Sequence, residues 1–194
     1  MAQALDDMAG LGFERRNRSQ AKLGVMEELL LEAFRHNAWA NKTLIAYCRN
    51  LTPDQLQATT GGTYGGILAT LNHLVASDAG YLPRIKVKRP DWAGDDEHIE
   101  GLDVLDARVD EAAKLWEGYL ADPLDSRHLL SLDNGAYEAQ ASVPIVQALH
   151  HANVHREQVS SVITSLGLEP PDLSVWAFGE ATGRSRELHP SADS

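Results

Sequence analysis

Three of the chain's eight histidines lie within six residues, in the segment ALHHANVHREQV at positions 148–159. His151 and His155 are four residues apart, so on a helix their imidazoles share one face and can both reach a single metal ion. His150 is turned about 100° away from His151, because an α-helix completes one turn in 3.6 residues. The spacing therefore makes His151 and His155 candidate metal ligands and leaves His150 outside the site.

A two-histidine site needs at least one further ligand, and His73 is the best candidate in the remaining sequence. It lies beside the apolar stripe of a predicted helix, and its neighbours one helical turn away are small, which leaves space in front of the imidazole. Small residues also favour close helix packing, so this alternative stays open. The zincin motif is excluded, because Ala152 follows His151 where that motif places a glutamate.

Four predicted amphipathic helices must position these histidines. Apolar residues recur at three- and four-residue steps over 25–51, 65–85, 102–120 and 143–167. Between the third and fourth helices, Asn134-Gly135 separates two short runs and predicts a small β-hairpin. Gly167 and the following EPPD segment end the last helix. This pattern predicts an all-α fold, a four-helix bundle with a small β-hairpin before the last helix.

The composition is that of an ordinary globular protein, with 43% hydrophobic residues and a formal net charge of −11. This charge argues against a nucleic-acid partner and against attraction to an anionic membrane surface. Cys48 is the only cysteine, which excludes an internal disulfide and suits a reducing cytoplasm. No apolar run reaches the roughly 18 residues that a membrane span needs. We therefore expect a cytoplasmic protein with no nucleic-acid or membrane partner.

The domain organisation predicted from the sequence is simple. Residues 1–22 have no apolar core of a secretory signal and are expected to be a disordered leader. Residues 23–178 are expected to form the bundle, and the polar residues 179–194 a flexible tail.

Three segments of the chain resemble the DinB/YfiT-like (damage-inducible) family of metal-binding four-helix-bundle proteins. They are RHNAWANKTLI (35–45), ILATLNHLVASDAGYLPRI (67–85) and HHANVHREQVSSVITSLGLEPPDLSVWAF (150–178). The resemblance implies an up-up-down-down bundle that is often a homodimer. It also implies that His73, His151 and His155 bind a divalent metal ion, zinc or nickel. Three histidines would leave a coordination position open, as in catalytic zinc sites.

Other side chains are candidates for supporting this site. Gln158 lies one turn beyond His155 and could orient its imidazole from outside the ligand set. The candidates for a substrate pocket are Asn37, Asn41, Trp39, Tyr81 and Arg84. Each has a plainer alternative: the asparagines could be a hydrogen-bonded core pair, the aromatic rings core packing, and the arginine a surface or ion-pair residue.

The function expected from this site is a metal-dependent enzyme acting on a small molecule, either a hydrolase or a low-molecular-weight thiol transferase. Both activities occur in the family that the sequence resembles. A metal ion can lower the pKa of a bound water or activate a thiolate. The alternative is a non-catalytic metal-binding or interaction bundle. The sequence identifies no catalytic acid or base, and it names neither the substrate nor the metal.

Overall fold

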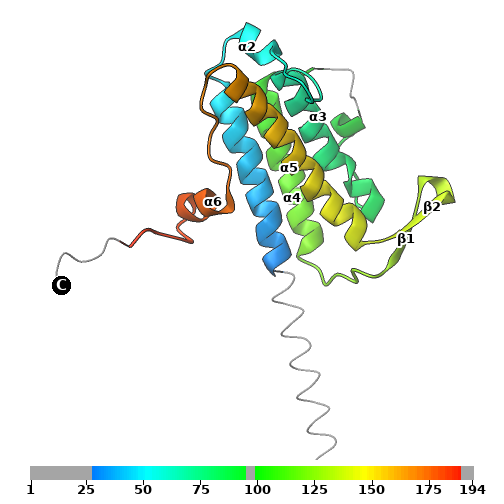
Figure 1. Ribbon diagram of the computed structural model, residues 1–194. Coiled ribbons are helices and arrows are strands. Elements are labelled where there is room, and N and C mark those ends of the chain that lie inside the picture. Colours follow the sequence, from blue (N-terminus) through cyan, green and yellow to red (C-terminus); the bar gives the residue numbers. More distant parts are fainter. Residues whose placement is uncertain (1–27, 95–98, 189–194) are drawn as a thin grey trace, which may run out of the picture.

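A computed structural model describes residues 28–94 and 99–188, and within them the chain is a bundle of four long helices (Figure 1). The first helix covers residues 28–48, and the others are α3 (Ile67–Gly80), α4 (Leu102–Leu120) and α5 (Ser142–Ser165). Two short helices accompany them, α2 (Pro53–Gln57) and α6 (Val175–Ala181). The predicted all-α class is confirmed, whereas the expected leader lies outside the described residues. None of the described helices is long and apolar enough to cross a membrane.

The second long helix is shorter than its apolar pattern predicted. The α-helical part ends at Gly80, and Leu82–Ile85 continue as one turn of 3₁₀-helix. Pro83 explains the change, because proline has no N–H to donate to the preceding turn. The predicted loop over 86–100 also contains a 3₁₀ turn, Asp91–Gly94. Both 3₁₀ segments pack against α3.

The predicted hairpin is present between α4 and α5. Strands β1 (Leu129–Leu132) and β2 (Tyr137–Gln140) pair antiparallel, with Leu132 opposite Tyr137. Asn134 and Gly135 both have positive φ, 58° and 89°, which asparagine and glycine tolerate best. Figure 1 shows the hairpin projecting beside the start of α5.

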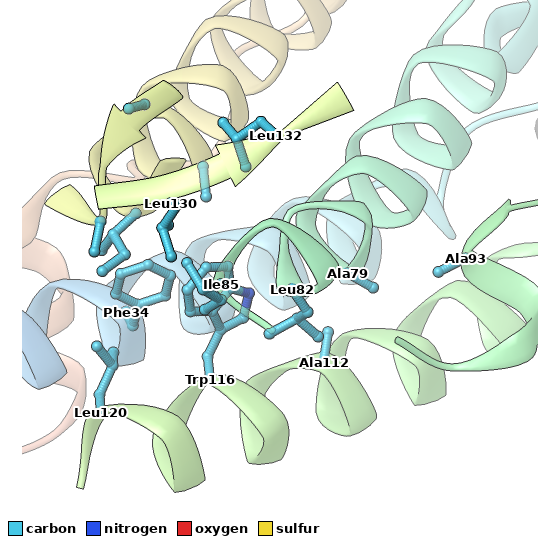
Figure 2. Close-up of a cluster of buried hydrophobic side chains, with 14 residues drawn as sticks. Phe34, Ala79, Leu82, Ile85, Ala93, Ala112, Trp116, Leu120, Leu130 and Leu132 are labelled. Carbon is cyan, nitrogen blue, oxygen red and sulfur yellow. The ribbon is translucent and has the colours of Figure 1, made fainter. Parts of the chain in front are cut away.

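Two apolar clusters fill the bundle. In the first, shown in Figure 2, Phe34 of the first helix packs on Trp116 of α4 with ring centroids 4.3 Å apart. The indole Nε1 of Trp116 donates to the backbone oxygen of Asp78 at 3.1 Å, so its polar atom is satisfied in the core. The second cluster fills the other end with residues from the same four helices, including Leu44, Leu71, Val109 and Ile163. Leu29, an apolar residue near the start of the described part of the first helix, is 62% exposed and belongs to neither cluster.

The directions of the helices differ from the expected up-up-down-down order. Arg35 pairs with Glu117 and Arg49 with Asp103, so the first helix runs antiparallel to α4. Figure 1 shows the first helix and α5 running one way and α3 and α4 the other, an up-down-down-up order. The physical reason lies in the connections. The segment with α2 reverses the chain between the first helix and α3, whereas α3 and α4 both begin at the end of the bundle that holds the second cluster and so run in the same direction.

The helix α6 is absent from the sequence prediction. Ser174 caps its first turn by accepting a hydrogen bond from the backbone N–H of Ala177 at 3.2 Å. Phe178 of α6 is buried, and its ring lies 5.6 Å from that of Trp39. The predicted boundary between bundle and tail, at 178, therefore falls inside a helix.

Candidate metal centre

The three predicted histidines meet between α3 and α5. The Nε2 atom of His151 lies 3.3 Å from Nε2 of His73 and 3.2 Å from Nε2 of His155. One ring nitrogen from each of the three residues falls within 4.8 Å of the others. His73 is 78 and 82 positions away from His151 and His155 in the chain, yet all three histidines direct a ring nitrogen at one point.

These distances fit a divalent metal ion. Zinc–nitrogen bonds of about 2.0–2.1 Å at a tetrahedral angle place two ligand nitrogens about 3.3–3.4 Å apart. The measured separations of 3.2 and 3.3 Å are close to that edge length. His73, His151 and His155 could therefore hold a metal ion with little movement of their rings.

The ligand group has three members among the residues that the structure describes. No aspartate, glutamate or cysteine from the described chain joins it. The thiol of Cys48 is fully buried in the second apolar cluster, where burial raises its pKa to about 12. A three-histidine set resembles catalytic zinc sites, which keep a position for water or substrate, more than closed structural sites.

The surroundings favour the neutral form of two of the three candidate ligands, His151 and His155. Burial is the main reason that the pKa of His151 falls to about 4, and the neighbouring histidines His155, His73 and His150 lower it further. Burial also lowers the pKa of His155, against the opposing effect of a hydrogen bond to Gln158. A metal ion needs the neutral imidazole, so the shift at His151 preserves its metal-binding lone pair well below pH 7, and the shift at His155 acts in the same direction.

Gln158 holds the His155 ring from the side away from the site. Its Oε1 lies 2.9 Å from Nδ1 of His155, and because an amide oxygen only accepts, Nδ1 carries the hydrogen in this contact. The Nε2 atom then presents its lone pair to the centre. The same Oε1 accepts the backbone N–H of Tyr64 at 3.2 Å. Gln158 therefore contacts His155, and its role in orienting a metal ligand stays a prediction.

Tyr64 is a site residue that the sequence analysis missed. Its ring stacks on His73 with centroids 4.1 Å apart and meets His155 edge-on at 5.6 Å. The side chain is 56% exposed, so it forms the solvent-side wall of the centre. It belongs to the glycine-rich loop before α3, where no periodic pattern marks it. The available signal was an aromatic residue flanked by glycines just before the helix that carries His73.

Two of the predicted pocket residues lie on the other side of the centre. The Tyr81 ring meets His151 edge-on, with centroids 5.8 Å apart. Tyr81 and Arg84 together line two surface hollows next to this contact. Arg84 also forms an ion pair with Asp133 at 3.6 Å, in which both side chains are largely exposed.

Asn37 and Asn41 lie in the buried interior instead of lining a wet pocket. Both accept hydrogen bonds from Nη1 of Arg156, at 2.8 Å in the case of Asn41. All three side chains are at most 3% exposed, and Asn37 also donates to the carboxyl group of Asp78 at 3.4 Å. The hydrogen-bonded core alternative is therefore the correct one. Burial raises the pKa of Asp78 to about 7, although the nearby Arg156 acts in the opposite direction.

Trp39 also differs from its predicted place in a pocket. Its described ring contacts are with His36 at 6.1 Å and with Phe178 at 5.6 Å, so it anchors α6 and not the metal centre. The ring nitrogen of His36 lies 2.8 Å from the backbone oxygen of Leu173 in the same region. Trp39 fixes the segment after α5 against the first helix.

The remaining histidines lie away from the centre or outside the description. His150 and His128 are exposed, in agreement with the prediction that His150 stands outside the site. His98 and His189 are not among the described residues.

Comparison with known protein families agrees with this geometry. The model of the DinB family matches residues 26–187, which include all four long helices and all three histidines. The chain belongs to the DinB family. The search of curated proteins finds no match to this chain. Membership in the DinB family, together with the three-histidine cluster, supports an assignment as a candidate metal-binding bundle.

Proposed function

We propose that this DinB-family protein is a metal-dependent enzyme that acts on a small molecule by hydrolysis or by transfer of a low-molecular-weight thiol. The observation that carries the proposal is the convergence of three histidine Nε2 atoms, 3.2 and 3.3 Å apart, at a partly exposed point between α3 and α5. A closed structural site would need a fourth ligand, and the described residues supply none.

His73, His151 and His155 are the residues that would hold the ion. A divalent metal bound there supplies Lewis acidity, which lowers the pKa of a bound water or thiol. Gln158 keeps the His155 ring in the tautomer that offers Nε2, and Tyr64 shields one side of the centre from water. Because the ligand group contains no carboxylate, thiol transfer is the simpler reaction. A thiol loses its proton near pH 8.5 and needs less help from a general base than water does.

The proposal also covers the metal, the partners and the oligomeric state. We propose zinc or nickel as the ion, a small molecule such as a thiol as the substrate, and a homodimer in a cytoplasmic setting. The net charge of −11 supports the absence of a nucleic-acid partner. Light scattering on the purified full chain measures the oligomeric state directly, and a monomer at micromolar concentration would refute the dimer.

Activity is tested on chelator-stripped protein before and after zinc or nickel is restored. The substrates are a panel of thiol acceptors, each paired with several small thiols, and a panel of esters and amides. We expect turnover that returns with the metal and is lost in His73→Ala. His150→Ala is the matched control, because this exposed histidine lies outside the ligand group. Stoichiometric metal without turnover on any panel would instead favour the non-catalytic alternative.

A further inference from the structure

Two hollows lie near the three-histidine cluster, one at the end of α3 and the other beside the start of α5. Ala76 and Ser77 are three and four residues from His73, so the first hollow begins about 5 Å along α3 from that histidine. It has a volume of about 270 Å³ and lies between the end of α3 and the two 3₁₀ turns. The second, of about 360 Å³, lies between the hairpin and the start of α5, where Gln147 is one turn from His151. Tyr81 lines both hollows and touches His151.

The first hollow has a positive lining in a strongly acidic chain. Arg84 and Arg89 are its charged side chains, and its described lining contains no carboxylate. Its remaining described residues are small or aromatic: Ala76, Ser77, Gly80, Tyr81 and Ala93. A concave surface of one charge sign raises the local concentration of oppositely charged ligands. In a molecule of net charge −11, two arginines in one hollow are a specific feature and not a general property of the surface.

The second hollow supplies an apolar surface next to this positive one. Its lining includes Leu132, Ala139, Val143 and Pro144 from the hairpin and from α5. Arg84 belongs to both linings and so stands at their junction.

We propose that Arg84 and Arg89 form an oxyanion-binding subsite of the metal centre, which selects small molecules that carry a carboxylate or phosphate group at the end remote from the reacting atom. The inference rests on the proposed function, because it assigns the substrate class of the same site. Guanidinium groups suit this role, since they bind planar oxyanions through two parallel hydrogen bonds. The apolar hollow then accepts the aliphatic part of the molecule between its anionic and reacting ends.

Asp133 occupies the subsite's edge and competes with the substrate. Its carboxylate lies 3.6 Å from Arg84, and the two side chains are 63% and 44% exposed. Exposed ion pairs of this kind contribute little, so an incoming oxyanion can displace the carboxylate. Removing this charge should therefore strengthen anion binding, whereas removing the arginine should weaken it.

The first test uses the metal-free full chain and the side-chain Nε–H signals of its arginines in nitrogen-15 NMR spectra. Succinate and inorganic phosphate are titrated separately, which distinguishes carboxylate from phosphate recognition. We expect saturable shifts at Arg84 and Arg89 with at least one of the anions, and no shift at Arg49, which pairs with Asp103 on another face. No shift at Arg84 and Arg89, or an equal shift at Arg49, would overturn the subsite.

The second test uses the cobalt-loaded chain and a matched pair of thiols, 6-mercaptohexanoate and 6-mercaptohexan-1-ol. Binding is followed by the thiolate-to-cobalt absorption band. We expect the carboxylate form to bind about tenfold more tightly, equivalent to about 1.4 kcal/mol. Arg84→Gln and Arg89→Gln should remove this preference, Arg49→Gln should keep it, and Asp133→Asn should increase it.

The two tests separate the two proposals. Equal affinity for both thiols in the cobalt-loaded parent would overturn the subsite and leave the metal centre intact. Failure of the chain to bind cobalt would overturn the proposed function. In that case the NMR titration of the metal-free chain still decides whether the arginines bind anions.

Discussion

At the level of single residues, the candidate metal centre depends on side chains that hold the three histidines as well as on the histidines themselves. Gln158 accepts hydrogen bonds from Nδ1–H of His155 and from the backbone N–H of Tyr64. It therefore couples a ligand imidazole to the loop that shields the centre. Such supporting contacts fix the tautomer and the orientation of a metal-binding histidine.

Removing the hydrogen bond between Gln158 and His155 should weaken metal binding. Gln158→Leu removes the acceptor for Nδ1–H and should lower zinc affinity by roughly 10- to 100-fold. Gln158→Glu keeps an acceptor at this position and should retain most of the affinity. Competition with a chromogenic chelator measures both variants, and an unchanged affinity in Gln158→Leu would show that Gln158 does not support the ligand.

Asp78 makes stability depend on pH. Its carboxyl group is buried and its pKa is raised to about 7, against an unfolded value of 3.8, so the folded chain holds a proton that the unfolded chain releases. The protonated Asp78 carboxyl therefore adds to the free energy of unfolding. This stabilising contribution is fully present below about pH 4 and is lost as the pH rises to about 7. Relative to wild type, Asp78→Asn should therefore gain stability between pH 5 and pH 8, by an amount on the order of a few kcal/mol.

Urea denaturation of both proteins at pH 5 and pH 8 measures this difference. Comparing the two proteins cancels the contributions of the histidines, which titrate in the same range. An Asp78→Asn variant that loses stability relative to wild type at pH 8 would show that Asp78 is ionised and paired with Arg156.

The sequence could predict part of this residue-level arrangement. His151 and His155 were identifiable because four residues on one helix fix their relation. His73 and Gln158 followed from the neighbours and spacing on their own helices. Tyr64 could not be identified from the sequence, because its contact with His73 depends on the path of an irregular glycine-rich loop. Asn37 and Asn41 were ambiguous because their partner, Arg156, lies more than 110 positions away.

At the level of elements, the segment from α2 to α3 positions the loop that covers the centre. The backbone of Gly66, at the start of α3, passes close to Gln57 at the end of α2. A Cβ atom added to Gly66 would lie 2.9 Å from the backbone oxygen of Gln57. Because backbone cannot swing away as a side chain can, this junction tolerates only glycine without movement.

Gly66→Ala should push α2 away from α3. We expect a loss of about 1–3 kcal/mol in the free energy of unfolding, as for other overpacked contacts, and weaker zinc binding because Tyr64 moves with the loop. Gly65→Ala is the matched control, since its Cβ would meet only the Ala69 side chain at an ordinary 3.5 Å. Equal stability of the two variants by urea denaturation would contradict the predicted clash.

The elements themselves were predictable to different degrees. The bounds of α4, 102–120, match because a continuous apolar stripe runs from its first residue to its last. The end of α3 was missed because the apolar pattern continues through the 3₁₀ turn that Pro83 imposes. The helix α6 was missed because it has seven residues, and the first two, Val175 and Trp176, are exposed.

At the level of the whole molecule, the three-histidine cluster joins α3 to α5. The order of helix directions that makes this meeting possible could not be read from the sequence, because it depends on which connections reverse the chain. A ligand that binds only the folded state stabilises it according to its affinity and concentration. The three histidines come from two helices and should meet only in the folded chain. A metal ion bound by them should therefore stabilise the folded state.

Metal should therefore raise the thermal stability of the full chain. At a free zinc concentration 100 times the dissociation constant, the gain is about 2.7 kcal/mol. Calorimetry with and without a chelator measures the shift in the unfolding midpoint. The increase should be absent from His151→Ala, and an equal increase in that variant would place the stabilising ion elsewhere.

The most direct measurement is the metal content of tag-free protein by mass spectrometry. We predict about one zinc or nickel ion per chain in the parent and in His150→Ala, and none in the His151→Ala, His155→Ala double variant. A parent chain that holds no stoichiometric metal even after reconstitution, or a double variant that keeps it, would contradict a metal centre formed by His73, His151 and His155.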